Sequence, residues 1–128
     1  MSHGTFATTI NCMDGRTQLP VNEFIKSNYH VDFVDTITEA GPDKILADNT
    51  DATTIESIKK RVLVSTEKHG SKKIIIVAHY DCAGNPVDKE THLKHLQEAR
   101  NTINSWGLLT DIQIVTVWVD ENWQVNLI

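Results

Sequence analysis

The chain has 128 residues, with 12 Lys or Arg against 17 Asp or Glu and a net charge of −5 at pH 7. This balance, with no cluster of basic residues, argues against a nucleic-acid or membrane surface. The longest apolar run, Ile74 to Ala78, is too short to cross a bilayer. No basic segment followed by a long apolar one opens the chain, so we predict a cytoplasmic protein. Its length favours a single domain over residues 1–128 that folds without a metal.

Strand-like and helix-like segments alternate along the chain. Phe6 to Asn11 reads as a first strand ending at Cys12, and Pro20 suits the first turn of a helix that runs to about Asn28. A second strand is predicted over 31–37, and Ala40-Gly41-Pro42 breaks it.

The second half of the chain repeats this alternation. Thr53 and Glu56 form a capping-box pattern at the start of a helix that Gly70 would end. Residues 73–78 are rich in Ile and Val and predict a strand buried on both faces. Asp88 is the expected N-cap of a long helix ended by Gly107, and the remaining strands are predicted over 112–119 and 123–127.

The inner stripe of the long helix is predicted from helical spacing, at Leu93, Leu96, Ala99, Ile103 and Trp106. His92 and His95 would then lie on its solvated face rather than form a second metal site.

This alternation predicts an α/β fold with three layers: a mostly parallel sheet flanked by helices, with right-handed crossovers. The expected strand order is 2-1-3-4, with a possible fifth strand at the edge. Ligands of such sheets bind beyond the carboxyl ends of the strands where the order reverses. Cys12 follows the first strand, and His79 and Cys82 follow the third. We therefore expect these three residues to converge.

Two thiolates and an imidazole suit zinc, whereas carboxylate-rich sites suit magnesium or calcium. Three protein ligands leave a fourth position for water, which ionises near pH ~7 when zinc binds it. A Cys12–Cys82 disulfide is the alternative, but it leaves His79 unexplained.

Asp14 and Arg16 lie two apart, so on an extended segment both would point to one face. Arg16 can then hold Asp14 ionised through a bidentate ion pair. Asp14 could accept a hydrogen bond from zinc-bound water, or it could bind zinc itself and close the site. The pair could also be only structural, capping the strand end.

The motifs Cys12-x-Asp14-x-Arg16 and His79-x-x-Cys82 resemble the signature of the β-class carbonic anhydrase family. The resemblance implies one zinc ion per chain, held by Cys12, His79 and Cys82, with Asp14 and Arg16 as the catalytic dyad. It also implies a lyase, a carbonate dehydratase in which zinc-bound hydroxide hydrates carbon dioxide reversibly to bicarbonate. Members of the family are typically homodimers or higher even oligomers.

The surroundings of the motifs depart from the family pattern. Thr38-Glu39-Ala40-Gly41 stands where the family usually has Arg-Asn-Ala-Gly, and Ala83 stands in place of a glycine, with Gly84 one position later. Only eleven residues precede Cys12, so we expect no N-terminal helical arm. Tyr80, Gly41, Ala83 and Gly84 are the expected pocket residues. A zinc hydrolase of carbonyl sulfide or carbon disulfide, or a non-catalytic zinc module, remain alternatives.

Overall fold

Five strands form one sheet in the computed structural model, which describes residues 4–128. The strands are β1 (Phe6–Cys12), β2 (Phe33–Glu39), β3 (Lys73–His79), β4 (Gln113–Val119) and β5 (Val125–Leu127). Their order is β2-β1-β3-β4-β5, with β5 antiparallel to β4 and the other neighbours parallel. This confirms the predicted fold class and strand order, including the short edge strand.

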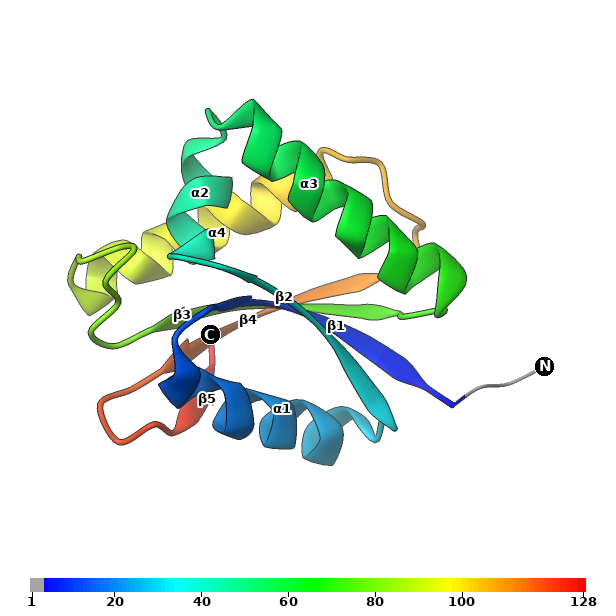
Figure 1. Ribbon diagram of the computed structural model, residues 1–128, viewed down its shortest axis with the longest axis horizontal. Coiled ribbons are helices and arrows are strands. Elements are labelled where there is room, and N and C mark those ends of the chain that lie inside the picture. The colour runs from blue at the N-terminus through cyan, green and yellow to red at the C-terminus, as the bar shows by residue number, and fades with distance from the viewer. Residues whose placement is uncertain (1–3) are drawn as a thin grey trace.

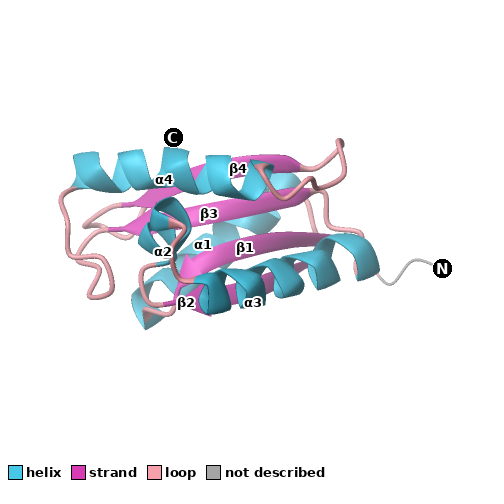
Figure 2. Cartoon of the chain, turned by 90° about the horizontal axis from the view of Figure 1, so that it is seen from above, coloured by secondary structure: helices cyan, strands magenta, loops and turns pink. Residues whose placement is uncertain are grey.

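The helices cover both faces of this sheet. They are α1 (Gly15–Tyr29), α2 (Pro42–Asp48), α3 (Ala52–Leu63), which continues into the π-helical turn η1 (Val64–Lys68), and α4 (Lys89–Asn104). The helix α1 lies on one face, and α2, α3 and α4 lie on the other (Figures 1 and 2). Among residues 4–128, no helix has both the length and the apolar character needed to cross a membrane.

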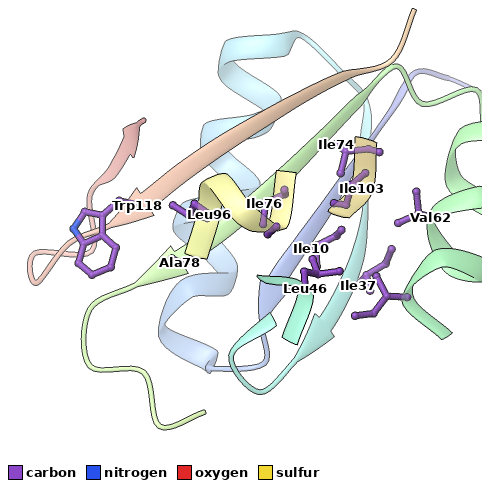
Figure 3. Close-up of a cluster of buried hydrophobic side chains, with 12 residues drawn as sticks. Ile10, Ile37, Leu46, Val62, Ile74, Ile76, Ala78, Leu96, Ile103 and Trp118 are labelled. Carbon is purple, nitrogen blue, oxygen red and sulfur yellow. The ribbon is translucent and has the colours of Figure 1, made fainter. Parts of the chain in front are cut away.

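The sheet separates two apolar clusters because successive strand residues point to opposite faces. Ile10, Ile76 and Trp118 belong to the cluster under α2, α3 and α4, which Figure 3 shows. Ala7, Ile75 and Val117, on the opposite face, pack with the buried residues of α1. The central strand β3 is buried at six of its seven positions, as predicted for a strand covered on both faces.

The predicted start of the first helix is wrong. It begins at Gly15, and Pro20 lies inside it, because the Asp14 side chain caps the helix by accepting the Arg16 N–H. Asp14 and Arg16 therefore do not lie on an extended segment. The buried positions Thr17 and Val21 extend the amphipathic face across the proline.

Other elements also differ from the prediction. Asp51, rather than Thr53, caps α3, because its carboxylate accepts both the N–H and the hydroxyl of Thr54. The strand β2 lies two residues further along than expected. The short helix α2 was not predicted, although Pro42 at its first turn follows a common pattern. Asp88 caps α4 as expected, through the N–H of Thr91.

Two loops cross at the carboxyl end of the sheet, at Gly41 before α2 and at Gly84 after β3. A Cβ atom added at Gly84 would lie 2.4 Å from the backbone carbon of Ala40 and 2.6 Å from the nitrogen of Gly41. Gly41 also has a positive φ of 67°, a region that side chains with a Cβ rarely occupy. Only glycine allows the two backbones to lie this close.

We predict that Gly84→Ala lowers the free energy of unfolding by about 1–3 kcal/mol, because backbone must move to admit the methyl group. Gly15→Ala is the matched control, since nothing lies within 4 Å of its Cβ position. Urea unfolding of both variants measures the difference. Equal unfolding midpoints for the two would contradict the close contact between the loops.

Candidate metal centre

The three predicted metal ligands lie together at the carboxyl ends of β1 and β3. Cys12 and His79 are the last residues of these neighbouring strands, and Cys82 follows in the turn after β3. The two sulfur atoms are 3.9 Å apart, and one ligand atom from each residue lies within 4.8 Å of the others. All three residues are buried, and both cysteines are free thiols.

His79 is oriented for metal binding through its outer ring nitrogen. Its Nδ1 donates to the carbonyl oxygen of Tyr80 at 2.7 Å, which leaves Nε2 with a lone pair. Nε2 is buried and has no hydrogen-bond partner. An unpaired buried nitrogen is costly, and a metal would satisfy it. This atom and the two sulfurs fit the donor set of zinc.

The thiols are polarised in a way that favours a bound cation. The Cys82 thiol, 3.9 Å away, holds the pKa of Cys12 well below its usual range, with smaller effects from His79 and from the backbone at Gly41 and Asp14. The pKa of Cys82 is raised, first by its bond to Cys12 and then by burial. Cys12 is therefore the thiolate of the pair, and Cys82 keeps a proton that a thiolate-binding metal would displace.

His79 responds to the same charges. Burial lowers its pKa, but the adjacent Cys12 sulfur, the hydrogen bond to the Tyr80 carbonyl and the charge of Asp14 outweigh burial and raise the pKa. The site therefore collects negative charge around a buried imidazole.

Asp14 and Arg16 form a close pair beside these ligands. Arg16 Nη2 lies 2.6 Å from Asp14 Oδ2, and its Nε contacts both carboxylate oxygens. These bonds, led by that of the Arg16 side chain, lower the pKa of Asp14 to about 2. Asp14 Oδ2 is also 4.0 Å from His79 Nε2. The carboxylate is thus ionised, held by Arg16 and next to the candidate metal ligands.

Two contacts of Arg16 were not foreseen. Its Nη2 donates to the carbonyl oxygen of Asp81, and its Nη1 lies 3.3 Å from the Asp81 carboxylate, so Arg16 joins the loops after β1 and β3. Its guanidinium also lies 4.5 Å from the ring centroid of Trp123. The available sequence signal was the turn-forming run Asp120-Glu121-Asn122, in which Asp120 accepts N–H bonds and brings Trp123 back over the site.

A cavity of about 680 Å³ adjoins Cys82. Its wall includes Tyr80 and Trp118 and four carboxylate residues, Asp81, Asp88, Asp120 and Glu121, against one cation, Lys89. Of the four expected pocket residues, only Tyr80 lies in this wall; Gly41 and Gly84 lie at the loop crossing.

The prediction that His92 faces solvent is wrong. His92 is only 1% exposed, and it lies against Trp118 and the carboxylate of Asp43. Helical spacing assigned the inner stripe to Leu93 and Leu96, which assumes that α4 packs only on the sheet. In the structure α4 also packs against α2, and His92 lies on the side of α4 that contacts Asp43 of α2. His95, in contrast, is partly exposed.

Comparisons with known proteins agree with this geometry. The model of the family described as "Putative carbonic anhydrase" matches residues 2–128. Among solved structures, the chain is similar to the β-carbonic anhydrase CafA of the fungal pathogen Aspergillus fumigatus, with 14% identity and a TM-score of 0.50. That match covers 99% of this chain and 76% of CafA. A search of curated proteins found no match. The chain therefore belongs to the carbonic anhydrase family that this model describes, and it has the fold of the β class.

Proposed function

We propose that this chain is a zinc-dependent carbonic anhydrase that hydrates carbon dioxide reversibly to bicarbonate. The observation that carries the proposal is the buried, unpaired Nε2 of His79 lying with the sulfurs of Cys12 and Cys82, next to an ionised Asp14. Family membership supports the same reaction.

Cys12, His79 and Cys82 would hold one zinc ion per chain. When bound, zinc lowers the pKa of a coordinated water to about 7 and so supplies a nucleophile at neutral pH. The protein's part is to hold the three donors in place. The Tyr80 carbonyl fixes the ring of His79 and leaves Nε2 for the metal, and the metal's charge would displace the proton that Cys82 keeps.

Asp14 would orient the reacting water by accepting a hydrogen bond from it. A carboxylate with a pKa of about 2 stays ionised at neutral pH and can only accept hydrogen bonds. Arg16 keeps it in place through three side-chain bonds and one backbone bond. Because Arg16 holds Asp14, the fourth zinc position would stay open for water. This favours the enzyme over the non-catalytic alternative, in which Asp14 would be a permanent fourth ligand.

The cavity beside Cys82 suits a small uncharged substrate. Four carboxylates in its wall would repel an anion, so they would favour release of bicarbonate while leaving neutral carbon dioxide unaffected. Pro86 and Val87 add apolar surface.

Carbonyl sulfide and carbon disulfide are also small and uncharged, so their hydrolysis is the second candidate function. Glu39 favours this second function. It stands where the family pattern has a different residue, and its carboxylate pairs with Arg61.

We further propose that two copies associate and that the protein works in a reducing compartment such as the cytoplasm. Met13, Leu19 and Tyr80, all near the site, are exposed by 65%, 67% and 47%. Apolar exposure of this kind is typical of a subunit interface. Both thiols must stay reduced to bind zinc. Sedimentation of zinc-loaded protein tests the association.

We predict about one zinc ion per chain by elemental analysis, and carbon dioxide hydration by stopped flow on the same sample. His79→Asn removes a metal ligand, so both zinc and activity should be lost. His69→Asn is the matched control, since this partly exposed histidine bonds Asp35 away from the site. Zinc-loaded protein that is inactive between pH 7 and 9 would contradict the carbon dioxide reaction. Turnover of carbon disulfide by such a sample would support the second candidate.

A second prediction concerns Asp14 and pH. Its folded-state pKa of about 2 lies below the ordinary value of 3.8, so its charge stabilises the fold above that ordinary value. The stabilisation falls as the pH drops toward 2. Asp14→Asn keeps a good N-cap but loses the charge. In metal-free protein, urea unfolding should show a larger deficit for this variant at pH 7 than at pH 3. A deficit that is equal at both pH values would show that the Arg16 pair does not set this pKa.

A further inference from the structure

A second buried polar cluster lies next to the metal centre but outside it. It contains Asp43 in the first turn of α2, Asn85 in the loop after β3 and His92 in the first turn of α4. Each of these residues is at most 1% exposed. Charged and polar groups are rarely buried to this degree unless they are paired, so the cluster needs an explanation.

The hydrogen bonds of the cluster converge on one carboxylate oxygen. Asp43 Oδ2 accepts from His92 Nδ1 at 2.6 Å and from Asn85 Nδ2 at 3.0 Å. The second hydrogen of the Asn85 amide points to His95 Nδ1 at 2.9 Å. Because Asp43 can only accept, this network assigns the His92 proton to Nδ1. Asp43 thus joins the start of α2 to the loop after β3 and to the start of α4, 42 and 49 residues further along the chain.

Two of these segments are also joined to the candidate zinc ligands by backbone contacts. The N–H of Asn85 bonds the carbonyl oxygen of Cys82 at 3.3 Å and closes the turn that carries this ligand. The N–H of Met13, next to Cys12, bonds the carbonyl oxygen of Glu39 at 2.9 Å, just before the loop that leads to Asp43. The Asn85 side chain therefore ties the turn that carries Cys82 to the helix start whose preceding loop is bonded next to Cys12.

We propose that Asp43, Asn85 and His92 are positioning residues that set the distance and direction of the two thiolates without touching the metal. This inference rests on the proposed zinc site. Contacts outside the ligands fix where the ligands lie and how they point, and loss of such outer contacts typically costs about 10–100-fold in metal affinity. The glycine contact between the loops sets how closely they lie, and the Asp43 bonds hold them there.

Asn85→Ala tests the proposal most sharply, because it cuts the tie to Asp43 but keeps the backbone N–H at residue 85. We expect zinc affinity, measured by competition with a chromophoric chelator, to fall by about 10–100-fold. The thiolate charge-transfer absorption of the cobalt-substituted protein should shift or weaken. Ser71→Ala is the matched control, because it removes a buried 2.7 Å bond to Thr8 near the start of β3, away from the metal centre. It should lower the thermal midpoint but leave the zinc affinity and the cobalt spectrum unchanged.

A second pair of variants separates positioning from general stability. The side-chain amide of Asn can replace His Nδ1 as a donor, whereas Leu cannot. His92→Asn should therefore keep a metal affinity closer to the wild type than His92→Leu does, in folded samples matched for thermal midpoint. This pair also decides the matter if Asn85→Ala does not fold. Unchanged zinc affinity and cobalt spectra in Asn85→Ala, or in His92→Leu, would overturn the proposal.

These readouts do not depend on catalysis. Wild-type protein that binds zinc but does not hydrate carbon dioxide would contradict the proposed reaction, and the effects of the variants on affinity would still decide the positioning role. Wild-type protein that binds neither zinc nor cobalt would overturn both proposals.

Discussion

The parallel pairing of β1 with β3 is the constraint on which the rest of the site depends. Thr8, Thr9 and Ile10 pair with Ile74, Ile75 and Ile76. This register ends both strands at the same edge, so Cys12 and His79 meet there although more than sixty residues separate them. A shift of one residue would turn each side chain to the opposite face and separate the ligands. The apolar clusters on both faces oppose such a shift, because it would force side chains such as Ile10 and Ile76 into packing formed for other residues.

Burial and charge then act together at this edge. Burial alone makes a thiolate and an ionised carboxylate costly, but each has a donor: the Cys82 thiol for Cys12 and Arg16 for Asp14. Arg16 also bonds the loop after β3 and packs against Trp123, so one side chain links both motifs. The site is therefore prepared for a cation by contacts from several elements, and the three ligands are only its innermost part.

The parts of the fold that were predictable depend on local patterns and on one topological rule. The Ile- and Val-rich run of β3 and the helical spacing of Leu96, Ala99 and Ile103 are visible in the sequence alone. Right-handed crossovers then favour the observed strand order, which brings Cys12 and His79 together.

The positions of His92 and Trp123 depend on partners that are distant in the sequence, whereas the start of α1 depends on a local cap. His92 is buried because Asp43 and Asn85 satisfy it, and no periodicity within α4 contains that information. The start of α1 was misplaced because the capping role of Asp14 outweighed the usual preference of proline for a first turn. Trp123 reaches Arg16 only through the turn at Asp120.

X-ray absorption spectroscopy of the zinc-loaded protein tests the central claim most directly. Two cysteines and one histidine predict a zinc shell with two sulfur atoms at about 2.3 Å and a histidine nitrogen at about 2.0–2.1 Å, completed by one light atom. A shell without sulfur, or with only one sulfur per zinc, would show that Cys12 and Cys82 do not bind the metal together and would contradict this account of the site.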